Sequence, residues 1–180
     1  MVKLESKLAT RRNKIGILGG SFDPAHKGHL TISKEAIKRF KLRNVIWAIT
    51  KKNPFKKKSD NNISARIKYC RRIVKKKNFI KIKFFENIIK SNKTIDLINH
   101  LSKNKKSEIY FIMGADNLIN FHKWHKWNTI SKKCTLIVFD RQGYKKKSQN
   151  SVAFKKLKGK NLEFIKFNKV NISSSQLRKI

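Results

Sequence analysis

Short apolar runs alternate along this chain with longer segments in which apolar residues recur every three or four positions. Such runs are typical of buried strands, and the wider spacing is typical of helices. Strands that alternate with helix-length segments predict βαβ units and a mostly parallel sheet. Right-handed crossovers then place helices on both faces, so we expect a doubly wound α/β fold. The expected strands are 14–18, 45–49, 79–84, 109–113, 135–139 and 162–167, and helical spacing occurs over 30–40, 67–74 and 95–101.

Polar segments between these elements predict loops and helix ends. A basic loop from Lys51 to Ser59 follows the second expected strand. The stretch around Lys145–Lys147 is polar and indicates a surface loop. Thr94 stands directly before the third helical segment, where its hydroxyl suits a cap.

The chain has 180 residues, which fits a single domain over 1–180, with 1–13 as a loose basic extension. A domain of this size buries about 70% of its unfolded surface, so it needs no disulfide or metal to fold. We therefore expect Cys70 and Cys134 to be reduced thiols packed as small apolar groups. No apolar run is long enough to cross a membrane, and Met1–Thr10 lacks the apolar core of a signal peptide. These features predict a cytoplasmic protein without a membrane partner.

The charge is strongly positive, with 46 Lys and Arg residues against 10 Asp and Glu residues, a formal +36. A polyanion such as nucleic acid is one explanation. A biased genome is the other, because the cations are mostly lysines that occur with many Asn and Ile residues along the whole chain. A dedicated nucleic-acid surface would use more arginine. We favour the second explanation and leave the first open, and either way a positive field attracts phosphorylated substrates.

The first expected strand ends at a turn that is suited to phosphate. Ligands of parallel sheets bind beyond the carboxyl ends of the strands. Gly19 and Gly20 lack a Cβ and allow close approach, and the segment Ser21–Asp23 offers backbone N–H groups. The helix that begins near Gly28 directs its positive dipole end at the same place. The sequence therefore predicts an anion site here.

Two histidines, His26 and His29, stand three residues apart at the start of this helix. That spacing puts both imidazoles on one side of the first turn, where they can donate hydrogen bonds to phosphate oxygens and one can carry a proton. The alternative is one capping and one packed histidine, which the preceding strand and double glycine disfavour. The segment contains neither the Gly-Lys-Ser/Thr of a P-loop nor the Gly-x-Gly-x-x-Gly of dinucleotide sites.

This turn, Gly19-Gly20-Ser21-Phe22-Asp23-Pro24-x-His26-x-Gly28-His29, resembles the signature of the His-x-Gly-His nucleotidylyltransferase superfamily. The superfamily's second motif, Ile-Ser-Ser-Thr-x-Ile-Arg, is similar to Ile172-Ser173-Ser174-Ser175-Gln176-Leu177-Arg178. The resemblance implies a Rossmann-like fold and nucleotidyl transfer.

The middle of the chain is similar to bacterial nicotinate-nucleotide adenylyltransferases. The similar segments are Phe111–Leu118, Phe121–Trp124 and Thr94–Leu97, so the resemblance covers roughly 14–180. It implies adenylyl transfer from ATP to nicotinate mononucleotide in NAD biosynthesis. Phosphopantetheine adenylyltransferase is an alternative, although that family usually has Thr where this chain has His26 and lacks the tryptophan segment. A basic nucleic-acid-binding protein on an inactive transferase fold is another.

The resemblance also implies a role for each motif residue. His26, His29 and Arg178 act on the ATP phosphates and the departing pyrophosphate, and Asp116 binds the ribose. Trp124 stacks on the nicotinate ring, Thr94 recognises its carboxylate, and Lys56 or a neighbour holds the mononucleotide phosphate. The remaining ATP-binding residues are Gly19, Gly20, Ser21, Phe22, Ser174 and Ser175.

Mg²⁺ is expected on the ATP phosphates rather than in a protein metal site, because the chain offers few carboxylates. Ser175 and Leu177 replace the family's Thr and Ile and keep the hydroxyl and the volume. Family members usually continue with another helix, whereas this chain stops at Ile180, so we expect Arg178 to be less firmly placed.

Overall fold

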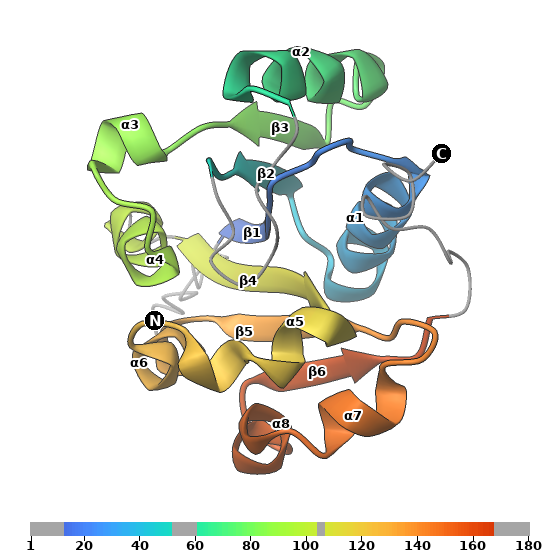
Figure 1. Ribbon diagram of the computed structural model, residues 1–180, viewed down its shortest axis with the longest axis vertical. Coiled ribbons are helices and arrows are strands. Elements are labelled where there is room, and N and C mark those ends of the chain that lie inside the picture. Colours follow the sequence, from blue (N-terminus) through green and yellow to red (C-terminus); the bar gives the residue numbers. More distant parts are fainter. Residues whose placement is uncertain (1–12, 52–60, 104–106, 168–180) are drawn as a thin grey trace, which may run out of the picture.

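The computed structural model describes residues 13–51, 61–103 and 107–167, whose strands form one six-stranded sheet (Figure 1). The order is β3-β2-β1-β4-β5-β6, and every neighbouring pair is parallel. This confirms the doubly wound, Rossmann-like prediction, and all six expected strands are present. The third and the sixth are shorter than expected. The strands are β1 (Asn13–Gly20), β2 (Asn44–Ile49), β3 (Ile80–Lys83), β4 (Ser107–Gly114), β5 (Thr135–Phe139) and β6 (Leu162–Ile165).

Helices cover both faces of this sheet, with α1 on one side in Figure 1 and α4 and α6 on the other. The three segments with helical spacing correspond to α1, α2 and α4. None of the described helices is long and apolar enough to span a lipid bilayer. The helices are α1 (Lys27–Phe40), α2 (Ile63–Ile73), α3 (Glu86–Ile89), α4 (Thr94–Ser102), α5 (Ala115–Ile119), α6 (Trp127–Lys133), α7 (Lys145–Gln149) and α8 (Val152–Leu157), with a 3₁₀ turn η1 (Phe121–Lys123).

Two local predictions were wrong. The Lys145–Lys147 segment is not a loop but the start of α7, because Ser148 is buried and its hydroxyl donates to the Lys145 carbonyl at 2.8 Å. Thr94 is not a cap but the first residue of α4. Ser91 organises that helix start instead, because its hydroxyl accepts from the Lys93 N–H at 3.1 Å and donates to Asp96 at 2.6 Å.

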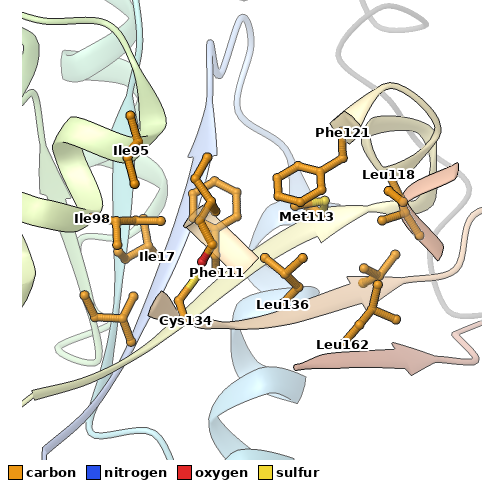
Figure 2. Packing of buried hydrophobic residues seen from close by; sticks show 14 of the residues in the cluster. Ile17, Ile95, Ile98, Phe111, Met113, Leu118, Phe121, Cys134, Leu136 and Leu162 are labelled. Atoms are coloured by element: carbon orange, nitrogen blue, oxygen red, sulfur yellow. Dashed lines mark hydrogen bonds between the residues drawn. The ribbon is translucent and has the colours of Figure 1, made fainter. Parts of the chain in front are cut away.

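The strand residues alternate between two apolar clusters, one on each face of the sheet. Ile17 belongs to the cluster under α4, α5, α6 and α8, and its neighbour Leu18 to the cluster under α1 and α2. Figure 2 shows the first cluster, in which Ile95 and Ile98 of α4 approach Ile17. Because successive side chains of a strand point to opposite faces, both faces of the sheet are covered by closely packed apolar side chains. This packing holds the carboxyl ends of the strands in fixed positions.

Candidate active site

The carboxyl ends of β1, β2, β4 and β5 meet at one edge of the sheet because these strands are parallel. β1 lies beside β4, where the strand order reverses direction along the chain. Open α/β sheets bind ligands at this switch point. The segments that leave these four ends are 21–29, 50–51, 115–125 and 140–141.

A cavity of about 320 Å³ opens at this edge, which is within the size range of small-molecule sites. Its wall brings together four predicted binding residues: Gly19, Gly20, Thr94 and Trp124. They come from β1, from α4 and from the turn after η1, which are far apart in the sequence. The other described candidates are outside this wall and are Ser21, Phe22, His26 and His29 after β1 and Asp116 after β4.

The paired histidines build the start of α1. His26 is the N-cap, and its Nδ1 accepts a hydrogen bond from the Gly28 N–H at 3.1 Å. His29 reaches back, and its Nδ1 accepts from the His26 N–H at 3.2 Å. The two ring centroids are 3.9 Å apart, so the predicted placement on one side of the first turn is confirmed.

These contacts determine which ring nitrogen of each histidine carries the proton. A nitrogen that accepts a hydrogen bond cannot carry the proton, so in each neutral ring the proton is on Nε2. Each neutral imidazole of this first turn then has its N–H donor at Nε2. Donors in this arrangement suit an anionic group such as phosphate. His26 caps the helix, and His29 both completes the capping box and packs against Phe22, so the capping and packing of the alternative are present in this turn.

Aromatic side chains pack against the turn after β1 and hold its backbone in place. Phe22 adopts a left-handed backbone with φ of 50° and is 1% exposed. Its ring stacks on Trp47 at 4.9 Å and contacts the His29 ring at 4.8 Å. Trp47 donates to the Ser33 hydroxyl at 2.9 Å, which donates to the His29 carbonyl at 2.7 Å. A non-glycine residue in this conformation persists only where its surroundings hold it, as they do here.

Thr94 is the first residue of α4, and Trp124 directly follows η1. Both residues line the same cavity. The Trp124 ring packs edge-on against Phe111 at 5.9 Å and against Phe121 at 5.3 Å. It is only partly buried, so it has ring surface left for a flat ligand. Thr94 is held by the start of α4 that Ser91 organises.

Several polar wall residues were missed by the sequence reasoning. Lys123 and His125 flank Trp124 and line the cavity, and both residues are exposed. Lys93 precedes Thr94 and also lines it. Glu86 accepts from the Thr50 hydroxyl and from the Lys51 N–H at 3.0 Å, and thereby joins α3 to the end of β2. In the sequence, only the positions of Lys93 next to Thr94 and of Lys123 and His125 next to Trp124 could have indicated that they line the cavity.

Asp116 is in the first turn of α5, and Gly114 is the N-cap of that helix. Its Oδ2 is 3.2 Å from the guanidinium of Arg141, a residue that sequence reasoning did not identify. A Cβ at Gly114 would approach Asp116 Oδ1 to 2.5 Å, so the glycine makes room for this carboxylate.

Four candidates lie outside the described residues: Lys56, Ser174, Ser175 and Arg178. Within 13–51, 61–103 and 107–167, no group of three His, Cys, Asp or Glu side chains could hold a metal ion.

Comparison with known proteins identifies the family of this chain. The model of the cytidylyltransferase-like family matches residues 17–180. A curated protein of Pelagibacter ubique, named probable nicotinate-nucleotide adenylyltransferase, is 64% identical over 180 residues, which are 100% of both chains. A protein of the same name from a Nitratiruptor species is 39% identical over 135 residues, 73% of this chain and 76% of the relative.

A similar solved structure is the Plasmodium falciparum nicotinic acid mononucleotide adenylyltransferase complexed with NaAD. Its TM-score is 0.74, with 93% of this chain and 83% of that chain covered, and at 20% identity the likeness shows the fold alone. The family model and the end-to-end Pelagibacter relative carry the assignment further. By these matches the chain belongs to the cytidylyltransferase-like family and, within it, to the nicotinate-nucleotide adenylyltransferases.

Proposed function

We propose that this protein transfers the adenylyl group of ATP to nicotinate mononucleotide, forming nicotinate adenine dinucleotide and pyrophosphate. This reaction is a step of NAD biosynthesis. The observation that supports it most is the pair His26 and His29 at the switch point, next to a cavity that contains Trp124. The end-to-end relative carries the name of this activity.

ATP binds along the turn after β1. The backbone of Gly19, Gly20, Ser21 and Phe22 approaches the phosphates, since the buried Phe22 side chain is directed away from ligand. His26 and His29 donate from Nε2 to phosphate oxygens, and the N-terminus of α1 adds its dipole.

Three further residues complete the ATP site, and they lie outside the described residues. We assign phosphate contacts to Ser174, Ser175 and Arg178. Asp116 accepts from the ribose hydroxyls, and Arg141 holds its carboxylate in place.

Nicotinate mononucleotide occupies the cavity. Trp124 stacks on the pyridine ring, and Thr94, which lines the same cavity, recognises the carboxylate. Lys93, Lys123 and His125 surround this space with cationic or donor groups, which favour an anionic ring substituent. Lys56, which lies outside the described residues, or a neighbouring lysine of the same segment holds the 5′-phosphate.

The reaction is a direct in-line displacement. The 5′-phosphate of the mononucleotide attacks the α-phosphorus of ATP, the bond to the bridging oxygen breaks, and pyrophosphate leaves with that oxygen. Burial raises the pKa of Cys70 and of Cys134 to about 12, so neither thiol supplies a nucleophilic thiolate. Catalysis is then positioning of the two phosphates together with stabilisation of the developing charge by the histidines.

Mg²⁺ is the proposed cofactor and binds through the ATP phosphates. Among the described residues near the site, Glu86 is engaged by Thr50 and Asp116 by Arg141. Such a donor set fits a cation that takes its oxygen ligands from phosphates and water. When bound, Mg²⁺ neutralises phosphate charge. The reaction should stop when EDTA exceeds the Mg²⁺ concentration and resume when Mg²⁺ is restored.

We also propose a cytoplasmic location and a single domain over 1–180. Both cysteines are free and buried, which suits a reducing compartment. All described strands share one sheet, and Asn13, expected in the extension, belongs to β1, whereas 1–12 lie outside the described residues.

The test is pyrophosphate release from ATP and Mg²⁺ with three acceptors in parallel: nicotinate mononucleotide, nicotinamide mononucleotide and phosphopantetheine. We expect fast release with the nicotinate form and a product with the mass of nicotinate adenine dinucleotide. Pyrophosphate release with phosphopantetheine alone would show that the protein is a phosphopantetheine adenylyltransferase instead. No release with any acceptor would contradict adenylyl transfer.

A further inference from the structure

Arg66 of α2 is a buried cation at the active-site edge, only 4% exposed. Its guanidinium donates to four backbone carbonyl oxygens. Nε donates to Asn61 at 3.1 Å, one terminal nitrogen to Ser21 at 2.7 Å and to Thr50 at 2.8 Å, and the other to Lys51 at 3.2 Å.

Three of these four carbonyls belong to the segments that leave β1 and β2, and the fourth, that of Asn61, lies directly before the N-cap of α2. Ser21 is in the turn assigned to the ATP phosphates, and Thr50 and Lys51 begin the segment that leads to Lys56. The segments already touch, because the Thr50 N–H donates to the Gly20 carbonyl at 3.0 Å. Arg66 therefore connects the turn after β1 with the segment after β2, to which the proposed function assigns the ATP phosphates and the mononucleotide phosphate.

A second connection runs beside the first. Asp23 is fully buried and accepts from the Asn61 backbone N–H at 3.3 Å and from the Asn61 side-chain amide at 2.6 Å. Asn61 is also an Arg66 acceptor. The turn after β1 is thus attached to the start of α2 at two points, Ser21 and Asp23.

The presence of an arginine at position 66 is better explained by the geometry of its hydrogen bonds than by a gain in stability. Burial lowers the pKa of the Arg66 guanidinium, and nearby Asp23 opposes this by favouring the charged form. Desolvating a cation costs free energy, and buried charges are weak contributors to stability. A planar fork with five donors can, however, span several carbonyls in fixed directions, which a lysine ammonium cannot do.

We propose that Arg66 is a positioning residue that sets the distance between the ATP-phosphate turn and the mononucleotide-phosphate segment. This inference rests on the proposed function for its catalytic consequence. In-line transfer requires both phosphates in one geometry, and a misplacement of about 1 Å costs on the order of 10²-fold in rate. The donors of Arg66 are committed to backbone carbonyls, so it acts through Ser21, Thr50 and Lys51.

The kinetic test compares Arg66→Lys, Arg66→Ala and the control Arg71→Ala, an exposed arginine of the same helix. We expect kcat of both Arg66 variants to fall by on the order of 10²-fold, with smaller changes in either KM. Guanidinium ions at millimolar concentration should restore part of the kcat of Arg66→Ala, whereas ammonium should not. Arg71→Ala should keep the rate of the unmodified protein. An Arg66→Lys protein with full kcat would overturn the proposal.

Backbone hydrogen exchange tests the same proposal without turnover. In Arg66→Lys, which keeps the charge and is the variant expected to fold, the amides of Thr50, Lys51 and Asn61 should exchange faster while β4 and β5 remain protected. Exchange that is unchanged, or that rises equally over the whole sheet, would overturn the positioning role. If the unmodified protein forms no product, the proposed function fails, and the exchange pattern still decides whether Arg66 joins the two segments.

Discussion

Each histidine of the first turn uses its Nδ1 for the helix, and the proposed function assigns its Nε2 to the ATP phosphates. Nδ1 of His26 and Nδ1 of His29 both accept backbone N–H groups that α1 leaves without an intrahelical partner. If the proposed function holds, removing either ring affects capping and catalysis together, and an alanine variant cannot separate the two. Asparagine can, because it is a preferred N-cap with an oxygen acceptor near the position of Nδ1 and has no group at Nε2.

We predict that His26→Asn loses on the order of 10²-fold in kcat, as expected when a donor to the transition state is removed. The cap is kept, so the thermal unfolding midpoint should change little. Steady-state kinetics and calorimetry on the same sample provide both values. His26→Ala is the matched control and should lose the same rate and also about 1 kcal/mol of stability. Full activity in His26→Asn would exclude an Nε2 role for this residue.

The two cysteines provide a pH prediction. Burial raises the pKa of the Cys70 and Cys134 thiols from 9.0 to about 12. The folded state therefore holds these protons more tightly than the unfolded state. Their contribution to the free energy of unfolding is complete below pH 9 and is lost as the pH rises toward 12.

Urea titrations between about pH 8 and 11 should show this decline, and Cys70→Ala/Cys134→Ala should show less of it. Alkylation at about pH 8 should leave both thiols unmodified until urea unfolds the protein. Rapid alkylation of the folded protein would contradict the burial.

At the scale of elements, β1 and β2 pack against α1 with little spare room. A Cβ on Gly16 would come within 2.9 Å of Leu42 and Val45 side-chain atoms and within 3.1 Å of Ile112. All of these neighbours are buried between α1, β2 and β4. Because Gly16 has no side chain, Leu42, Val45 and Ile112 can pack closely against β1 in the apolar cluster under α1 and α2.

We predict that Gly16→Ala lowers the free energy of unfolding by about 1–3 kcal/mol, the usual cost of overpacking. Denaturant unfolding followed by circular dichroism measures it. The double variant Gly16→Ala/Leu42→Ala should lose less than the sum of the two single variants, because the shortened side chain makes room. Strict additivity would show that the predicted contact is not the cause.

At the scale of the molecule, the formal charge of +36 acts on every phosphorylated ligand. We predict that kcat/KM for ATP falls as salt rises from about 20 to 500 mM while kcat changes less, since screening weakens attraction rather than the bound complex. Stopped-flow or initial-rate measurements in NaCl check this. A kcat/KM that is independent of salt would leave the charge without a role in substrate capture. A nucleic-acid-binding function would instead require RNA affinity that falls steeply with salt.

Local patterns were sufficient for the secondary structure that builds the sheet. A strand or a long helix can be recognised from neighbouring residues, because burial on one face imposes a period that can be read directly. The spacing of His26 and His29 likewise determined their shared side of α1, since three residues make almost one helical turn. Short helices such as α7 (Lys145–Gln149) were missed, because five polar residues have no readable period and a tertiary contact of Ser148 decides them.

Only the tertiary structure decided which distant residues meet. The order of the strands placed Thr94 and Trp124 on one cavity wall, although no local pattern relates them. Arg66 and Ser21 are 45 positions apart, and their contact depends on how α2 packs against the ends of β1 and β2. The pairing of Asp116 with Arg141 depends on the adjacency of β4 and β5. A sequence records the chemistry of each residue, whereas long-range partners follow from chain topology, which the folding of the whole sheet selects.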